Sequence, residues 1–486
     1  MIITRVLDSL FKSSIKKSLC YTIIARLNSK GRCNYIIHSS YFIHTNFDFD
    51  RTGFRTSGRI IYVDAYYIPE EQSCPICGFT ALSKNGHIKK TVKHCTYYTM
   101  LFVVTCHIQA YKCQHCHSFF YEKDLFSNPS ETLSKESVFI ILDKLKQANT
   151  TFESIAKDLH ISRQNVIDVF DRYVDYSPGE LPSILSLDEK HVNKRMTENT
   201  YLFIIVDFKN VKIFDIVYSR HKYAIERYFN KIPLEQRKKV LAITMDMWEP
   251  YKEVCERYFI NAIIAVDSFH VMETINQAMD KIRISVEQKF NLKTENIEDN
   301  HIYYYMIKKF KFFFVKELDD IGDNYFYVRK LGARFTKQQI LKYLLDIDEK
   351  LEKAYYLTAQ YREFNKACVR SNCEEELEAI LDRFYASGLA PFFEVAKTIS
   401  TWKKYIINSF VVVPDALTKP KTAIEEPKPR RLSNGAIEGL NAIIEKINLN
   451  GNGYSNFYRF RNRCIYVINK DVPIKNTPIK LKKQSK

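Results

Sequence analysis

Two pairs of cysteines constrain the fold of this 486-residue chain more than any other feature. Cys74 and Cys77 form one CxxC pair, and Cys113 and Cys116 form the other. Each pair places two thiolates on a tight turn, and two such turns complete a tetrahedral zinc site. Residues 96–111, between the pairs, are rich in Val, Phe, Tyr and Thr, which favours strands. We therefore predict a zinc ribbon over residues 71–125 that holds one structural Zn²⁺ ion.

An alternative interpretation, in which the cysteines are small core residues, explains neither the paired spacing nor the glycine that follows Cys77. Twelve cysteines in this arrangement indicate metal binding in a reducing compartment, and we expect a cytoplasmic protein. Seven further Cys and His residues are surplus to a site with four ligands. One of the histidines could replace a thiolate as a zinc ligand, but each of the seven is expected to lie in a strand or loop without binding the metal. These are Cys95, Cys106, His87, His94, His107, His115 and His117.

The charge of the chain points to a polyanionic partner. Lys and Arg number 73 against 56 acidic residues, so the formal net charge is +17. Such a surplus favours nucleic acid or an anionic membrane. No apolar run reaches the roughly 18 to 20 residues that span a bilayer, so we expect nucleic acid and no membrane partner. The length predicts at least two domains.

The two ends of the chain are basic. The first 46 residues contain a single acidic residue, Asp8. This composition suits an organellar transit peptide, but a basic N-terminal arm, or a start codon assigned too early, is the preferred interpretation. We assign residues 1–70 to a basic N-terminal region, ending in a strand near 59–66, and residues 471–486 to a solvated basic tail.

Residues 130–178 have the pattern of a helix-turn-helix. Apolar residues at 152, 155, 156 and 159 follow the helical period, and Ser162 can cap a second helix over residues 163–173. In a helix-turn-helix the start of the second helix faces base edges. We therefore predict DNA contacts from Ser162, Arg163, Gln164 and Asn165. An ordinary helical hairpin with a solvated polar end is the alternative.

Residues 183–270 alternate strands with short helices. Strand-like runs end at Asp188, Asp207, Tyr218, Asp246 and Asp267, with helical patterns before and after the run to Asp246. The order of three strands, helix, strand, helix, strand is that of a ribonuclease H-like mixed sheet. In that topology the first and fourth strands are neighbours, so Asp188 and Asp246 are expected to converge.

Two close carboxylates repel each other unless a cation lies between them. Hard oxygen ligands with open positions suit Mg²⁺, and two such ions can drive an in-line displacement at phosphorus. Candidates for a third carboxylate are Asp267, Glu273 and Glu438. Acids also end strands simply because strands end at the surface, and Asp207 and Asp215 are expected to be such cases.

The rest of the chain has a different pattern. Residues 271–412 are almost entirely helix-patterned, so we predict an all-α insertion there. A turn-rich stretch from 413 to 429 follows, and a final helix begins near Asn434. Residues 430–470 are expected to complete the core.

Six motifs in this order resemble the ISL3 family of bacterial insertion-sequence transposases. They are the two CxxC pairs, the helix-turn-helix, Ser186-Leu-Asp188-Glu189, Met245-Asp246-Met-Trp248-Glu-Pro-Tyr251, Val266-Asp267-Ser-Phe-His270-Val271, and Ser433-Asn434-Gly-Ala-Ile-Glu438-Gly-Leu-Asn441. The resemblance covers about residues 74–466. It implies a DDE nuclease in which Asp188, Asp246 and Glu438 are catalytic and bind two Mg²⁺ or Mn²⁺ ions. Asp267 and His270 match a further motif, and we expect them to support the metal ligands or contact DNA, or to serve packing alone.

The resemblance implies a DNA transposase that binds terminal inverted repeats and target DNA, cuts strands and joins them. A homo-oligomer on DNA and a bacterial, nucleoid-associated cytoplasmic location are implied as well. The alternative is a catalytically inactive or domesticated zinc-containing DNA-binding regulator. A zinc-dependent RNA-binding protein is a third possibility, although no aromatic stacking signature is visible in the sequence.

Overall fold

The computed structural model describes residues 53–67, 72–95, 101–192, 196, 200–291, 297–418, 426–475 and 478–479, and the backbone of β1 (Ile24–Leu27) and β2 (Cys33–Ile36). The expected basic N-terminal region and basic tail fall mostly outside these residues. The chain divides into two compact units. The first comprises residues 1–175 and 473–486, and the second comprises residues 176–472.

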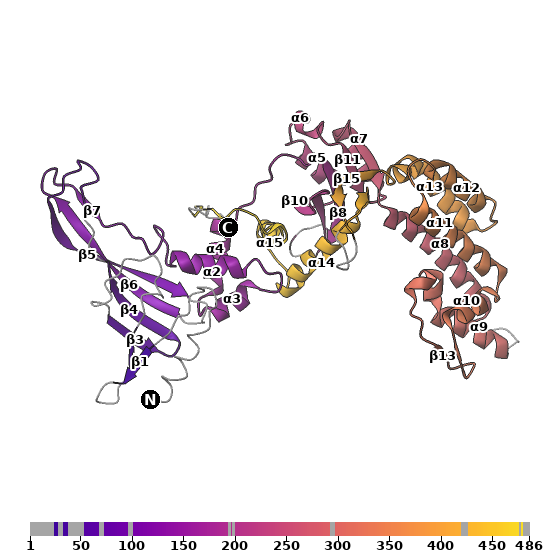
Figure 1. The fold of residues 1–486 in the computed structure, drawn as a ribbon, viewed down its shortest axis with the longest axis horizontal. Coiled ribbons are helices and arrows are strands. Elements are labelled where there is room, and N and C mark those ends of the chain that lie inside the picture. The colour runs from indigo at the N-terminus through magenta and orange to yellow at the C-terminus, as the bar shows by residue number, and fades with distance from the viewer. Residues whose placement is uncertain are drawn as a thin grey trace. The chain divides into compact units, whose positions relative to one another are not determined.

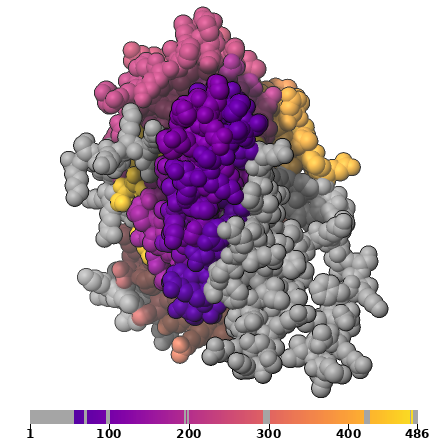
Figure 2. Space-filling view, turned by 90° about the vertical axis from the view of Figure 1, so that its left-hand side faces the viewer, coloured from indigo at the N-terminus to yellow at the C-terminus, as the bar shows by residue number. Residues whose placement is uncertain are grey.

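A five-stranded sheet forms the centre of the first unit. Its strands run in the order β3 (Gly53–Ser57), β4 (Ile60–Tyr66), β6 (Leu101–Cys113) and β5 (Leu82–Cys95), with β7 (Phe119–Tyr121) also paired to β6. Side chains alternate along β4, so Ile61, Val63 and Ala65 face the core of this unit. Figure 2 shows in indigo the surface that these strands present.

Three helices follow the sheet: α2 (Lys135–Lys144), α3 (Phe152–Asp158) and α4 (Arg163–Tyr173). Thr151 forms a capping box with Ser154 at the start of α3, and the Ser162 side chain caps α4. The buried Ala156 and the edge-to-face pair Phe152–Phe170 lie where α3 meets α4. The positions of α3 and α4 agree with the predicted helices.

Part of the predicted basic tail packs on the first unit instead of being solvated. The backbone N–H of Lys475 donates to Tyr173 O at 3.1 Å, and that of Ile479 donates to Arg172 O at 3.0 Å. The Lys475 ammonium also pairs with Asp175 at 2.8 Å. Backbone groups of this segment therefore satisfy the end of α4, a pairing that composition alone does not reveal.

The second unit is built on another five-stranded sheet, with the order β10 (Lys212–Val217), β9 (Tyr201–Asp207), β8 (Ile184–His191), β11 (Ala242–Met245) and β12 (Ile263–Val266). Strands β8, β9 and β10 form an antiparallel meander, whereas β8, β11 and β12 are parallel. The pairing of β8 with β11 agrees with the expectation that the first and fourth strands of residues 183–270 are neighbours.

The two faces of this sheet are covered by different segments (Figure 1). One face, with Leu185, Leu187 and Ile243, packs in a large apolar cluster against helices α5 (Lys222–Phe229) and α7 (Glu249–Tyr258). The other face contacts α14 (Gly435–Asn450), α15 (Phe457–Asn469) and the antiparallel pair β15 (Val412–Leu417) and β16 (Pro429–Arg431). Strands β15 and β16 lie at the two ends of the stretch that we expected to be turn-rich.

The segment between β12 and β15 is mostly helical. It contains α8 (Ser268–Lys289), α9 (Ile297–Lys309), α10 (Lys337–Leu345), α11 (Glu349–Ala367), α12 (Cys373–Tyr385) and α13 (Ala390–Asn408). Its buried residues belong to the same apolar cluster as the sheet, from Leu185 to Phe410, so one hydrophobic core spans both parts.

Two sequence predictions about this unit are wrong. The insertion is not all-α, because β13 (Phe326–Val328) and β14 (Ala333–Phe335) form a hairpin whose turn uses Gly332 at φ +61°. Asp215 is not a surface acid. It is 4% exposed, accepts hydrogen bonds from Tyr228 Oη at 2.8 Å and Arg461 Nε at 2.5 Å, and so ties α15 to β10.

Candidate functional sites

The four cysteines of the CxxC pairs meet at one point. Their sulfur atoms all lie within 4.8 Å of one another. Cys74 Sγ lies 3.5 Å from Cys116 Sγ, and Cys77 Sγ lies 3.6 Å from Cys113 Sγ. Zinc–sulfur bonds of about 2.3 Å in a tetrahedron require sulfur separations of about 3.8 Å. The residues present therefore fit a zinc ion.

A hydroxyl supports two of these sulfurs. Ser118 Oγ lies 3.2 Å from Cys74 Sγ and 3.0 Å from Cys116 Sγ. This hydrogen bond lowers the pKa of Cys74 to about 6 and also lowers the pKa of Cys116. Thiolates are the form that binds zinc. Cys95 and Cys106 are buried in β5 and β6 and are not members of the group.

Three aspartates lie at matching positions on the parallel strands of the second unit. Ser186 pairs with Thr244, and Thr244 pairs with Ala265. Two residues further along, the same register places Asp188, Asp246 and Asp267 toward the carboxyl ends of these parallel strands. This end of the sheet is called the aspartate edge below. Because side chains alternate, Asp188 and Asp246 share the face of Ser186 and Thr244, whose hydroxyls are 2.8 Å apart. The predicted convergence of Asp188 and Asp246 follows from this register.

The electrostatics of the aspartate edge favour a bound cation. Burial, together with the negative charge of Asp246, raises the pKa of Asp188 to about 7. Burial also raises the pKa of Asp267. Two buried carboxylates that repel each other are stabilised when a divalent cation lies between them.

One histidine partly neutralises this charge. His270, in the first turn of α8, places Nε2 2.9 Å from Asp246 Oδ1. This contact raises the pKa of His270 to about 9, against the opposing effect of burial. The ring therefore carries a proton near neutral pH and forms an ion pair with Asp246. Asp267 accepts a hydrogen bond from the backbone N–H of Asn434 at 3.1 Å.

Helix α14 is fastened to the aspartate edge by two asparagines. Asn434 Nδ2 donates to Asp246 Oδ1 at 3.2 Å and to Leu187 O at 2.8 Å. Asn441 Nδ2 donates to Asp188 Oδ2 at 2.7 Å. Glu438 lies between them, in the first turn of α14, where the helix dipole favours a carboxylate or a phosphate. Its side chain is exposed.

The three acids of the predicted catalytic set are not packed as tightly as the cysteines. Among the described residues, the cysteine group is the only set of three or more His, Cys, Asp and Glu ligands whose atoms all lie within 4.8 Å of each other. Asp188, Asp246 and exposed Glu438 are therefore more widely spaced. The amide oxygen of Asn441 is buried without a hydrogen-bond partner. A hydrated cation beside Asp188 would supply donors to it, so the donor set fits a hard, hydrated ion such as Mg²⁺.

The predicted DNA-contacting residues lie at the start of α4. Ser162, Arg163 and Gln164 are exposed, and Asn165 is half-buried. The Ser162 hydroxyl lies 2.7 Å from Asn165 Oδ1, and Gln164 Nε2 donates to Asp168 Oδ1 at 2.6 Å. Ser162 and Asn165 are thus engaged in capping and Gln164 bonds within α4, whereas Arg163 extends from the exposed first turn of the helix.

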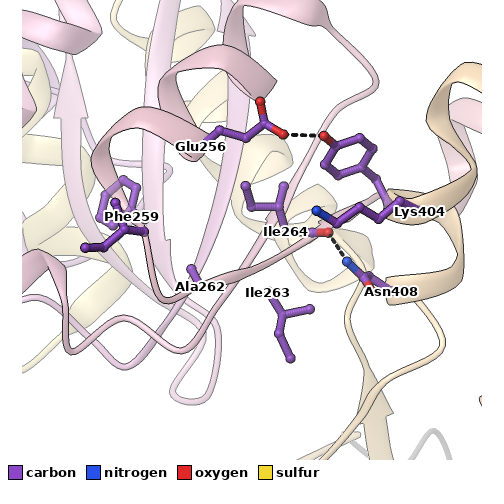
Figure 3. Close-up of a pocket in the computed structure, with 9 residues that line it drawn as sticks. Glu256, Phe259, Ala262, Ile263, Ile264, Lys404 and Asn408 are labelled. Carbon is purple, nitrogen blue, oxygen red and sulfur yellow. Dashed lines mark hydrogen bonds between the residues drawn. The ribbon is translucent and has the colours of Figure 1, made fainter.

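A cavity of about 390 Å³ opens beside the edge strand β12 (Figure 3). Asn408 donates to Ile264 O at 2.8 Å, and Tyr405 donates to Glu256 across its rim. Ile264 is at the opposite end of β12 from Asp267. The cavity contains none of the residues that the sequence analysis singled out.

The comparisons with known proteins define the class. A transposase family model matches residues 185–464, which is more than half of the chain and includes the sheet, the insertion and α14. The chain therefore belongs to that family, the DDE transposases of the ISL3 type. It is also similar to an uncharacterized 48.3 kDa protein of the insertion element ISM1 from Methanobrevibacter smithii. The two are 23% identical over 247 residues, which cover 47% of this chain and 57% of that protein.

The resemblance to the ISL3 family is thus confirmed, as is the expectation of a mobile-element protein. No helix in the described part of the chain has both the length and the apolar character to cross a bilayer. The sequence analysis missed the roles of Asn434 and Asn441. Their spacing around Glu438, at i, i+4 and i+7, puts all three on one helix face and was a visible signal.

Proposed function

We propose that this protein is a DNA transposase that binds the terminal inverted repeats of an insertion sequence and catalyses metal-dependent strand cleavage and strand transfer. The observation that carries this proposal is the register of β8 and β11, which brings Asp188 and Asp246 together on the sheet face that α14, the helix containing Glu438, contacts. The family match supports it, because it extends over all three acids.

In this proposal the second unit is a ribonuclease H-like core, and Asp188, Asp246 and Glu438 hold two Mg²⁺ or Mn²⁺ ions. When bound, such ions activate a water or a 3′ hydroxyl and stabilise the leaving 3′ oxygen. Asp188 and Asp246 would hold the ions through their carboxylate oxygens, and the N-terminus of α14 favours the negative charge of a phosphate. His270 holds Asp246 through Nε2. No covalent enzyme intermediate is required.

The first unit supplies DNA binding in this proposal. The zinc ribbon fixes the long β5–β6 pair, and α3–α4 acts as a helix-turn-helix that presents Arg163 and Gln164 to base edges. The net charge of +17 favours a phosphate backbone as partner. Terminal repeats and target DNA are the proposed partners, and a homo-oligomer would bring two element ends together.

Asp246→Asn tests the catalytic assignment. The change replaces one carboxylate oxygen by an NH2 group and removes a negative charge but no positive charge, so it should abolish Mg²⁺-dependent cleavage of a DNA end while leaving the binding of that DNA intact. Gel assays of cleavage and fluorescence anisotropy measure the two properties. Asp382→Asn, an exposed aspartate on α12, is the matched control. Full cleavage by Asp246→Asn would refute the site.

A non-catalytic DNA-binding regulator is the second candidate. The wide spacing of the three acids and the exposure of Glu438 favour it. The same assay separates the two functions, because a regulator would bind DNA ends and yet cleave none of them in the wild-type form with Mg²⁺ or Mn²⁺.

A further inference from the structure

The side chain of Asn434 does not cap helix α14, although the residue occupies the N-cap position. Asn434 is the residue that precedes the first turn of α14, where an asparagine normally accepts a hydrogen bond from a backbone N–H of that turn. No such bond is made here. The amide instead donates to Leu187 O and Asp246 Oδ1, and its oxygen accepts from Thr244 Oγ1.

The bonds of Asn434 join α14 to three strands. Leu187 belongs to β8, and Thr244 and Asp246 belong to β11 and its end. The backbone N–H of Asn434 donates to Asp267, which follows β12. At 4% exposure, Asn434 is held almost completely inside the protein. One residue thus fixes the start of α14 at the aspartate edge.

Asn441 fixes the same helix two turns later. Its Nδ2 donates to Asp188 Oδ2 at 2.7 Å, while the backbone N–H of Glu189 donates to Asp188 Oδ1 at 2.6 Å. Both oxygens of Asp188 are therefore oriented. At Asp246, Asn434 and His270 both reach Oδ1, so Oδ2 receives neither donor.

Residues 434, 438 and 441 share one face of α14, because they follow the i, i+4, i+7 spacing. Two points of attachment on that face fix both the rotation of the helix and its position along the strands. Glu438 lies between these two points. The contacts that Asn434 and Asn441 make with the aspartates therefore set the position of the Glu438 backbone, from which its side chain extends.

We propose that Asn434 and Asn441 are positioning residues that hold Asp246 and Asp188 and at the same time set the register in which α14 presents Glu438. This inference rests on the proposed function, since it concerns the same carboxylates. An amide suits this task because it donates a hydrogen bond to a carboxylate without adding another negative charge to a buried site.

Asn441→Ala is the main test, because Asn441 is only half-buried and the change removes its hydrogen bond to Asp188. Mn²⁺ affinity is measured by calorimetry on the zinc-loaded full chain without DNA, and thermal unfolding is followed in parallel. Mutation of a residue that orients a metal ligand typically lowers metal affinity or activity about 10- to 100-fold. We expect a loss of Mn²⁺ affinity in this range, with cleavage reduced to a similar degree and DNA binding unchanged.

Two further variants separate positioning from folding. Asn448→Ala removes an asparagine amide from the same helix, two turns beyond Asn441 and without a contact to an aspartate, so its Mn²⁺ affinity should equal that of the wild type. Asn441→Gln keeps an amide donor and should recover part of the loss. Asn434→Ala should have a larger effect than Asn441→Ala, and if it unfolds, Asn441→Ala decides the question.

Wild-type Mn²⁺ affinity in Asn441→Ala would overturn the proposal, and so would an equal loss in Asn448→Ala. Failure of the proposed function gives a different result, in which the wild type and Asp246→Asn bind Mn²⁺ equally weakly. Loss of Mn²⁺ binding in Asp246→Asn without any change in Asn441→Ala would retain the transposase site and reject the role of the asparagines.

Discussion

Replacing Asp188 by Asn should stabilise the metal-free protein at neutral and alkaline pH. Burial and the charge of Asp246 raise the pKa of Asp188 from 3.8 to about 7. The folded state thus binds this proton more tightly than the unfolded state does. The resulting stability is fully present below about pH 4 and is lost as the pH rises through about 7. Asparagine has no charge to lose.

The size of the effect follows from the shift. A difference of about 3 pKa units corresponds to about 4 kcal/mol at 1.36 kcal/mol per unit, which is an upper bound for the gain at pH 8. Near pH 4 the two proteins should be almost equally stable. Mg²⁺ should stabilise only the wild type, by about 2.7 kcal/mol at a concentration 100 times its Kd.

Urea unfolding in EDTA at pH 4.5 and pH 8, followed by tryptophan fluorescence, measures the change in the free energy of unfolding of the second unit, which contains Asp188. Both tryptophans of the chain, Trp248 and Trp402, belong to the second unit. Asp382→Asn is the control, and as an exposed substitution it should change the free energy of unfolding by less than about 0.5 kcal/mol. If Asp188→Asn shows no gain at pH 8 relative to pH 4.5, the inference that the Asp188 charge is buried and unneutralised is wrong.

Three other predictions concern separate parts of the molecule. Cys113→Ser should remove the bound zinc, measured by atomic absorption as one ion per wild-type chain and none in the variant, and should weaken DNA-end binding; unchanged zinc content would contradict the four-cysteine site. Arg163→Ala should weaken binding to a DNA end by about 1–3 kcal/mol with a smaller effect on unrelated DNA, and equal losses on both in anisotropy titrations would argue against base recognition. Arg461→Met should destabilise the second unit by about 3–5 kcal/mol in urea unfolding, because it leaves Asp215 buried and unpaired, and adding Asp215→Asn should restore much of that loss; equal stability of both variants would show that the pair contributes no such coupling.

Local patterns were sufficient to predict much of this protein. The CxxC spacing placed four thiolates, because the turns that hold each pair are local. The apolar period and the caps Thr151 and Ser162 located α3 and α4, since helix ends are fixed by neighbouring residues. The order of strands and helices in residues 183–270 was enough to expect Asp188 beside Asp246, because parallel strands of a known order align their ends.

Other features depended on contacts between distant residues. Asp215 looked like a surface acid until Arg461, far along the chain, was found against it. The β15–β16 pair covers the sheet face at the ends of a stretch that the sequence indicated only as turn-rich. The sequence by itself determined which residues carry carboxylates, thiolates and amides, and at what helical or strand spacing. Only the tertiary structure decided that Asn434 and Asn441 meet Asp246 and Asp188, because side chains from α14 and the sheet come together through packing of the whole unit rather than through any local pattern.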